Sequence, residues 1–404
     1  MSHPVPSEEL ARRYERCRRL LQQYASDAGG MLVVSRINIY YLTGTLGWGL
    51  VWLPLEGEPV LMLRKGLERA AMESPLRHVV PFKSYKEVAA LCAECGSPLT
   101  PVIAVDKNGF SWTMAEMLQS RLSSIRFASC DAVLAQARAV KSAWELGVLR
   151  RCGALHAAVM DDALPARMRP GMNEQEIARL YVEAVFACGG NGMLRMSAHG
   201  EENFFGYASA GTSGIYPTYY NGPLGCKGMC PAIPFMGDAG RVWERGAPLS
   251  IDMGFNAEGY NTDRTQVYWS GPTASIPEEV RRAHAVCVEV FERTAAELKP
   301  GAVPAKLWEQ ACALVEREGQ TEGFMGLGHN KVPFLGHGIG LTVDETPVFA
   351  KGFAAPLEEG MVVAIEPKIG IPGIGMVGLE HTLEITASGS RSLTGTETGL
   401  IGID

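Results

Sequence analysis

Apolar residues recur with a helical period in some stretches of the chain and in short strand-like runs in others. The first helical stretch, residues 8–27, carries apolar residues three or four positions apart, with arginines between them. The same reasoning predicts helices over residues 85–95, 112–121, 138–162, 174–188, 277–298 and 304–317. Apolar runs bounded by turn residues predict strands at residues 30–34, 48–53, 59–63, 79–82 and 102–105.

These elements suggest two domains. Strands alternate with helices up to about residue 133, which indicates an α/β N-terminal domain over residues 1–135. In the remainder, residues 136–404, a pair of helices precedes each of two hairpins, which predicts an α+β domain. The length of 404 residues agrees with two or three domains of about 150 residues each.

The first hairpin, residues 249–269, is rich in β-forming residues and has Asn256 and Gly259 near its middle. If its two-residue turn is Ala257-Glu258, Asp252 lies opposite Asp263 on the neighbouring strand. Facing carboxylates repel each other unless a cation lies between them. Two solvated aspartates near a turn are the alternative interpretation.

A second hairpin joins residues 361–369 to residues 376–386 through a turn rich in glycine. Centred on Gly373, it sets Glu366 opposite Glu380. Upstream lies His337 in the run Gly-His-Gly-Ile-Gly, whose glycines allow the backbone to approach whatever the imidazole binds. The two hairpins and this histidine together supply a ligand set for two divalent ions: Asp252, Asp263, Glu366, Glu380 and His337. The four negative charges of the carboxylates would balance the four positive charges of two such ions.

The motifs Ile-Asp-Met-Gly, Asn-Thr-Asp-Arg-Thr, Gly-His-Gly-Ile-Gly, Ile-Glu-Pro and Gly-Leu-Glu-His-Thr follow one another in this order. Their sequence resembles the metal-binding motifs of the creatinase, aminopeptidase P, prolidase and methionine aminopeptidase family, which has the "pita-bread" fold. Residues 38–44 resemble the N-terminal domain of that family, and Arg138, Lys141, Ser142 and Glu145 resemble the entry to its catalytic domain. The resemblance implies a creatinase N-terminal-like domain followed by a pita-bread metallohydrolase domain.

The resemblance also implies roles for the five residues. Asp252 would bind one ion and His337 the other, Asp263 and Glu380 would bridge them, and Glu366 would hold the second. Two ions held roughly 3.5–4 Å apart polarise one hydroxide and one carbonyl. We expect manganese, with cobalt, iron or zinc as alternatives. The implied reaction is cleavage, by a metal-bound hydroxide, of a dipeptide or short peptide with proline at its second position, and the implied assembly is a homodimer.

Three positions depart from the peptidase pattern. Thr218 and Asp344 stand where family peptidases carry histidines, and Gly378 stands where proline-specific members carry an arginine. General acid–base catalysis of the kind attributed to those histidines raises the reaction rate on the order of 10²–10⁴-fold, and threonine cannot supply it.

Other histidines could lie near the site. His199 precedes the Thr218 turn, so a loop could bring it close, although a surface position is the alternative. His329 is a candidate for the pocket entrance, and strand alternation turns His381 away from its neighbour Glu380.

Two other functions therefore stay open beside the peptidase. One is a non-peptidase enzyme on the same scaffold, either a creatinase-like C–N hydrolase or a dimethylsulfoniopropionate lyase-like enzyme. The other is a binding protein without catalysis, against which the five retained ligands argue. The Gly- and Pro-rich loop at residues 219–247 either serves the site or lies on the surface.

Composition narrows the possible partners. With 47% hydrophobic and 20% charged residues, the chain can form ordinary globular cores. A net charge of −7 argues against nucleic acid or an anionic membrane as partner. No signal-like or membrane-spanning run is present, which suggests a cytoplasmic protein. The ten cysteines, including Cys92-x-x-Cys95 and the pair Cys226 and Cys230, are expected to be free thiols rather than a disulfide framework or a metal site.

Overall fold

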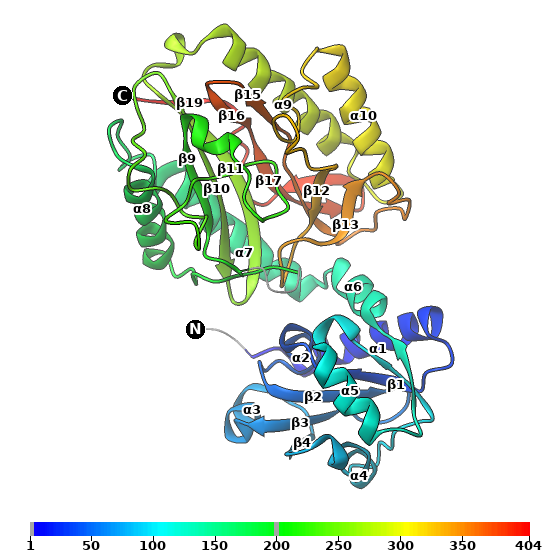
Figure 1. Ribbon diagram of the computed structural model, residues 1–404. Coiled ribbons are helices and arrows are strands. Elements are labelled where there is room, and N and C mark those ends of the chain that lie inside the picture. The colour runs from blue at the N-terminus through cyan, green and yellow to red at the C-terminus, as the bar shows by residue number, and fades with distance from the viewer. Residues whose placement is uncertain (1–3, 198–201) are drawn as a thin grey trace. The chain divides into compact units, whose positions relative to one another are not determined.

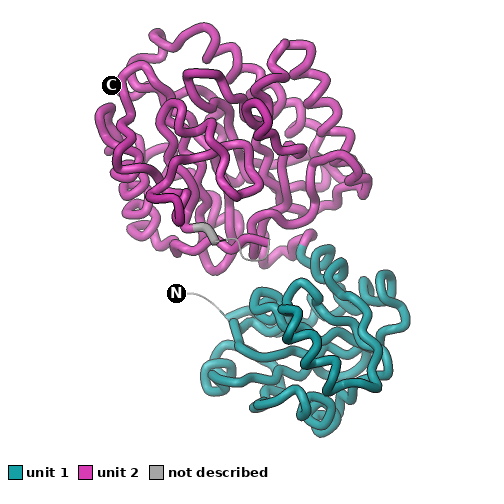
Figure 2. Tube along the Cα trace, in the orientation of Figure 1, with its two compact units in different colours: residues 1–138 teal, residues 139–404 magenta. Residues whose placement is uncertain are grey.

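The computed structural model describes residues 4–197 and 202–404, and the chain divides into two compact units, residues 1–138 and 139–404 (Figure 2). Unit 1 is built on a six-stranded mixed sheet with the order β4-β3-β2-β1-β5-β6. Its strands are β1 (Gly30–Val33), β2 (Trp48–Pro54), β3 (Val60–Lys65), β4 (His78–Pro81), β5 (Val102–Val105) and β6 (Arg126–Ser129). Its helices are α1 (Ser7–Tyr24), α2 (Arg36–Thr43), α3 (Leu67–Glu73), α4 (Val88–Glu94), α5 (Trp112–Arg121) and α6 (Asp131–Ala139).

Unit 2 contains a nine-stranded sheet, with β13-β12-β14-β17-β11-β10-β9 in order, β18 beside β17 and β19 beside β11 (Figure 1). All of these pairings are antiparallel except that of β11 with β19. The strands are β9 (Gly206–Ala210), β10 (Pro248–Ala257), β11 (Tyr260–Ser270), β12 (Phe334–Gly338), β13 (Glu345–Ala350), β14 (Val362–Ile365), β17 (Glu380–Thr386), β18 (Gly389–Ser392) and β19 (Ile401–Ile403). Two small pairs complete the unit, β15 (Lys368–Ile371) with β16 (Gly375–Gly378) and β7 (Leu194–Arg195) with β8 (Glu202–Asn203).

Two helix pairs cover the sheet of unit 2. Helices α7 (Ala143–Ala158) and α8 (Glu174–Ala187) pack against β9, β10 and β11, while α9 (Glu278–Glu297) and α10 (Pro304–Arg317) pack against β13, β15 and β16 (Figure 1). One apolar cluster lies under each pair. This repeated arrangement of helix pair and strands confirms the predicted pita-bread layout and leaves the hairpins to form the site between the two halves of the unit.

The predicted helix over residues 138–162 is wrong as a single element. Helix α6 ends at Ala139, and α7 begins at Ala143 after Ser142, whose backbone is extended and whose hydroxyl accepts a hydrogen bond from the Glu145 amide. This capping box fixes a new helix start. After Ala158 the chain continues as a π-helical turn over residues 159–163. A second capping box, from Asn173 and Glu176, starts α8 as the sequence predicts.

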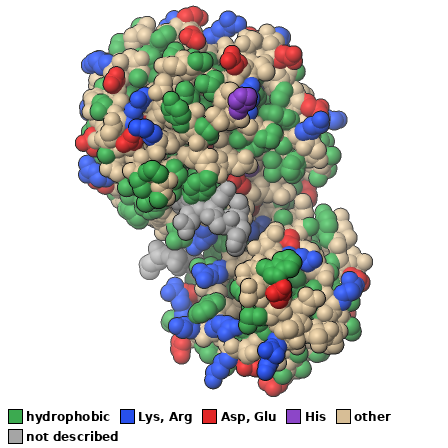
Figure 3. Space-filling view, in the orientation of Figure 1, with side chains coloured by type: hydrophobic (Ala, Val, Ile, Leu, Met, Phe, Trp, Pro, Cys, Tyr) green, Lys and Arg blue, Asp and Glu red, His purple; other side chains and the backbone are tan. Residues whose placement is uncertain are grey.

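The surface is mixed in charge. On the face shown in Figure 3, Lys and Arg side chains are interspersed with Asp and Glu side chains on each unit. Within residues 4–197 and 202–404, no helix combines the length and apolar character needed to cross a membrane.

Candidate metal centre and active site

The first hairpin brings its two aspartates to one face, although not in the predicted register. Strands β10 and β11 pair Ala257 with Tyr260, so the two-residue turn is Glu258-Gly259, not Ala257-Glu258. Both turn residues have positive φ, 52° and 86°, which is the geometry of the tight hairpin turn that suits glycine. Asp252 consequently faces Thr265, and Asp263 faces Gly254. Because side chains alternate along a strand, Asp252 and Asp263 still share one face, as diagonal neighbours.

The second hairpin has the predicted register. The β15–β16 pairs Lys368–Gly378 and Ile371–Gly375, and the β14–β17 pair Ile365–His381, are all centred on Gly373. The two long predicted strands are interrupted, however, at Glu366-Pro367 and at Leu379. Proline has no N–H to donate to a strand ladder, so the pairing breaks there. Glu366 and Glu380 lie at these breaks, where the chain passes from the large sheet to the small one.

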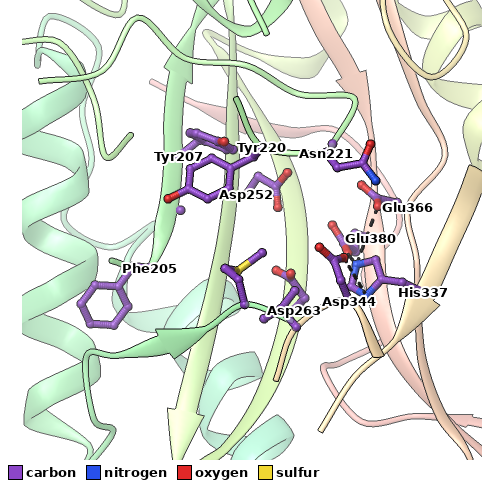
Figure 4. A pocket seen from close by; sticks show the side chains of 14 residues that line it. Phe205, Tyr207, Tyr220, Asn221, Asp252, Asp263, His337, Asp344, Glu366 and Glu380 are labelled. Carbon is purple, nitrogen blue, oxygen red and sulfur yellow. Dashed lines mark ion pairs between the residues drawn. The ribbon is translucent and has the colours of Figure 1, made fainter. Parts of the chain in front are cut away.

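The five predicted ligands line one pocket. Figure 4 shows Asp252 and Asp263, on the β10–β11 hairpin, facing three other side chains. Glu366 directly follows β14, Glu380 begins β17, and His337 lies on β12. Two groups each have ligand atoms within 4.8 Å of one another: Asp263, His337 and Glu380, and Asp252, Glu366 and Glu380. Their role as ligands stays a prediction, but the side chains are placed as that role requires.

Burial and mutual repulsion shape the electrostatics of the pocket. Burial raises the pKa of Asp252 to about 6, even though Lys368 acts in the opposite direction. Burial, reinforced by the charges of Glu380 and Asp252, raises the pKa of Asp263 well above its usual value. The pKa values of Glu366 and Glu380 are raised by burial in the same way. These carboxylates therefore need positive charge nearby to stay ionised.

Part of that positive charge comes from a residue that the sequence reasoning missed. The Lys368 ammonium lies 2.7 Å from Glu366 Oε2, 2.9 Å from Glu380 Oε2 and 3.2 Å from Asp252 Oδ2. Its side chain is 1% exposed. Burial acts to lower the pKa of Lys368, but its three acidic partners raise it well above the usual value. The signal was present in the sequence, because Lys368 is two residues from Glu366 and so falls on the same side of an extended chain.

The group of Asp263, His337 and Glu380 fits a divalent ion. His337 Nδ1 lies 3.0 Å from the Gly338 carbonyl oxygen, an arrangement in which Nδ1–H donates and Nε2 keeps its lone pair for a metal. Nε2 lies 3.8 Å from Glu366 Oε1 and 3.9 Å from Glu380 Oε1. Glu380 Oε1 is buried and has no hydrogen-bond partner among the described residues. Two carboxylates and one imidazole suit manganese, iron, cobalt or zinc.

The positions that depart from the peptidase pattern are divided between the pocket and its surroundings. Asp344 lines the pocket, with Oδ1 3.6 Å from His337 Nδ1. The Thr218 hydroxyl lies 2.9 Å from the Tyr207 hydroxyl, and Thr218 is not among the residues that line the pocket. Gly378 pairs with Lys368 in the small sheet. His199 lies outside the described residues.

The two remaining histidines are away from the pocket. His381 is buried and turned away from Glu380, as predicted, because its ring nitrogens lie 3.1 Å from Thr394 Oγ1 and 2.8 Å from the Glu397 carbonyl oxygen. His329 is exposed and does not line the pocket, so its predicted place at the entrance is wrong. His337 is thus the one imidazole that lines the pocket in the described part of the chain.

The long loop at 219–247 contributes to the site. Tyr220, Asn221 and Gly222 line the pocket together with Tyr207 (Figure 4). The fully buried Glu174 holds the base of this loop, because its carboxylate accepts hydrogen bonds from the amides of Ala210 at 2.7 Å and Asp238 at 2.9 Å. The cysteines are free, as predicted, and Cys226, within this loop, is buried.

Comparison with known proteins was made on sequence and on structure. Residues 147–387 match the family described as Metallopeptidase family M24, and residues 13–140 match the Creatinase/Prolidase N-terminal domain. An Xaa-Pro dipeptidase of Pyrococcus furiosus is 26% identical over 373 residues, covering 92% of this chain and 94% of that protein. The prolidase of Pyrococcus horikoshii OT3 superposes with a TM-score of 0.78 at 23% identity, covering 96% of this chain and 100% of that one. The dipeptidase PepE of Mycobacterium ulcerans superposes with a TM-score of 0.80 at 22% identity, covering 99% and 100%.

Proposed function

The chain belongs to metallopeptidase family M24, and we propose that it hydrolyses a dipeptide or short peptide with proline at its second position. The proposal rests above all on the convergence of Asp252, Asp263, Glu366, Glu380 and His337 on one pocket. It is also supported by relatives that are named Xaa-Pro dipeptidases and that match over most of their length.

The group formed by Asp263, His337 and Glu380, between whose members no lysine of the described chain reaches, would hold a divalent ion. Such an ion polarises a substrate carbonyl and lowers the pKa of a water molecule. The chain itself supplies acidic groups around that position, because Asp252, Glu366 and Asp344 also line the pocket. A carboxylate beside the ion accepts and returns a proton as a general base and acid. Asp344, which lines the pocket and is not a predicted ligand, is the candidate for the proton transfer that Thr218 cannot provide.

The charge of the pocket favours a substrate with a positive group. Five acidic side chains line it and one buried lysine reaches it, so the site keeps negative charge after one divalent ion binds. A short peptide brings a protonated amino terminus, which such a site attracts. Tyr207, Tyr220 and Asn221 add aromatic surface and an amide beside the carboxylates, which suits a small ring such as proline.

Turnover of a small substrate panel tests the proposal. Protein loaded with Mn²⁺ or Co²⁺ is given Ala-Pro, Gly-Pro, a proline-containing tripeptide and creatine. We expect cleavage of one or both dipeptides, and no cleavage by the Asp263→Ala variant. Glu384→Gln is the matched control, since Glu384 lies on β17 with Glu380 but binds Arg150 and Arg391 instead of lining the pocket. Failure to cleave any proline peptide while the ion is bound would rule the peptidase out.

A creatinase-like C–N hydrolase is the second candidate. It is favoured by Thr218 and Asp344 at the positions of peptidase histidines, and by Lys368 among three of the predicted ligands. A guanidino compound is also cationic, so the charge of the pocket does not separate the two candidates. Turnover of creatine without turnover of Ala-Pro would decide for this candidate.

Three finer expectations belong to the same proposal: manganese as the ion, a homodimer as the assembly and the cytoplasm as the location. Elemental analysis of protein purified from its own cells tests the first. Light scattering during size exclusion tests the second, and cell fractionation tests the third. A different ion, a monomer or a secreted protein would each correct one expectation without affecting the proposed reaction.

A further inference from the structure

We propose that the Lys368 ammonium takes the place of one of the two expected divalent ions, so that the centre holds one ion per chain, at Asp263, His337 and Glu380. The inference rests on the metal centre proposed above, but not on which amide is cleaved. The three ion-pair partners of Lys368 are also the members of one of the two candidate metal groups: Asp252, Glu366 and Glu380. The ammonium therefore lies where those carboxylates converge.

The ammonium binds the carboxylates of that group as a metal ion would. A lysine has three N–H donors, and Lys368 has one carboxylate oxygen for each, at 2.7, 2.9 and 3.2 Å. The side chain is 1% exposed, so water does not compete for these bonds. A buried ammonium is tolerated only when it is paired in this way.

The surrounding backbone makes room for the lysine. Lys368 pairs with Gly378 in the β15–β16 sheet. A Cβ atom at position 378 would lie 2.3 Å from the Pro367 carbonyl oxygen, 2.7 Å from Lys368 Cα and 3.1 Å from Lys368 Cγ, and the φ of Gly378 is 138°. A larger residue at 378 would therefore displace the backbone of residues 367–368, and the lysine stem with it.

A divalent ion and this ammonium exclude each other. An ion bound to Asp252, Glu366 and Glu380 would lie about 2.0–2.2 Å from their oxygens, in the space that Nζ fills. Two cations in contact within a buried site also repel strongly. The lysine would therefore have to leave a position in which its side chain is 1% exposed.

Of the other group, Asp263, His337 and Glu380, Lys368 contacts Glu380. Lys368 and Thr265 both donate to Glu380 Oε2, at 2.9 Å each. Glu380 Oε1 is left buried and without a hydrogen-bond partner among the described residues, and it points toward His337 Nε2. An unpaired buried carboxylate oxygen is costly, which identifies this position as the one that an ion completes.

Counting bound metal tests the inference. Purified full-length protein is incubated with excess Mn²⁺, desalted and measured by plasma mass spectrometry. We expect one equivalent per chain for the wild type and two for Lys368→Ala, which removes the ammonium and frees its space. Lys351→Ala, which removes an exposed lysine outside the pocket, is the matched control and should keep one equivalent.

The outcomes separate this inference from the metal centre on which it rests. Two equivalents in the wild type would overturn the inference and keep the metal centre, and this measurement needs no variant. One equivalent in both the wild type and a folded Lys368→Ala protein would also overturn it. No metal in either protein would overturn the metal centre itself, and the inference with it. If Lys368→Ala does not fold, Lys368→Gln retains a hydrogen-bonding side chain without the charge and should rise above one equivalent.

Anomalous diffraction from Mn²⁺-soaked wild-type crystals gives a second readout. We expect one peak, between Asp263, His337 and Glu380. A peak between Asp252, Glu366 and Glu380 would overturn the inference.

Discussion

Glu380 contributes one carboxylate oxygen to each half of the pocket, and the two oxygens have different partners. In the lysine-filled half, formed by Asp252, Glu366 and Glu380 around Lys368, Oε2 accepts hydrogen bonds from Thr265 and from the ammonium. In the open half, formed by Asp263, His337 and Glu380, Oε1 is buried with no partner among the described residues. The chain thus supplies a cation of its own to one half and leaves the other half to a ligand.

The difference shows how one side chain that is not a ligand can alter a metal centre. All five predicted ligands are present and close together, so a list of residues would imply two ions. A sixth residue, which is not a ligand, decides how many ions the same carboxylates can accept. Fold and ligand motifs therefore do not fix the function of such a site.

Removing a ligand from the open half is expected to have the largest effect. In Asp263→Ala, one of three donors is lost, so the ion should not be retained. Loss of the polarisation that an ion supplies, several kcal/mol, corresponds to a decrease in kcat/KM on the order of 10³-fold or more. Metal analysis and steady-state kinetics measure both. Full metal occupancy in a folded Asp263→Ala protein would contradict the assignment of this half, and Glu384→Gln provides the control.

Removing the cation from the lysine-filled half should lower stability in the absence of metal. Breaking a buried ion pair by deleting one partner costs about 3–5 kcal/mol. Lys368→Ala in chelator should therefore unfold at lower denaturant concentration than the wild type, and added Mn²⁺ should restore more stability to the variant than to the wild type. Denaturant unfolding followed by circular dichroism measures the change, with Lys351→Ala as control. An unchanged midpoint in chelator would show that the ammonium does not hold the carboxylates together.

Adding an imidazole beside the open half should raise peptide turnover. Asp344 lines the pocket with φ of 63°, a left-handed conformation that histidine also adopts. Asp344→His should raise kcat/KM for an Xaa-Pro dipeptide by up to on the order of 10²-fold, the lower end of general acid–base catalysis. Thr218→His should do less, because Thr218 contacts Tyr207 and does not line the pocket. No gain in either variant, alone or together, would favour chemistry other than peptide hydrolysis.

The smallest effect on metal binding is expected from removing a hydrogen bond to Glu380, the residue that belongs to both halves. The Thr265 hydroxyl orients Glu380 by donating to Oε2 at 2.9 Å. Thr265→Val removes that bond and should weaken metal binding about tenfold, the lower end for residues that support a metal ligand. Calorimetric titration with Mn²⁺ measures it. Thr386→Val, which removes a hydroxyl bonded to Gly389 at the β17–β18 turn, should leave the affinity unchanged.

The second hairpin shows how far the sequence could be read. The glycine-rich turn around Gly373 and the apolar runs on either side predict the pairing that the structure has. The first hairpin shows the limit, because Ala257-Glu258 and Glu258-Gly259 are both plausible two-residue turns in the sequence. The structure selects the second, in which Glu258 and Gly259 take positive φ. The two turns differ by two positions in the pairing of the strands, since Asp252 faces Thr265 and not Asp263. A shift of two keeps every side chain on its face, so Asp252 and Asp263 stay on the same face.

The sequence by itself determined the family, the fold, the helix cap at Asn173, and which carboxylates and imidazole converge on the pocket. These follow from local order along the chain: periodicity, turn residues and the spacing of motifs. Only the tertiary structure decided what those carboxylates bind. The contact of Lys368 with Asp252 joins β15 to β10, more than a hundred residues earlier in the chain, and depends on the absence of a side chain at Gly378. The spacing of Lys368 from Glu366 is visible in the sequence, but its contact with Asp252 depends on packing between distant elements.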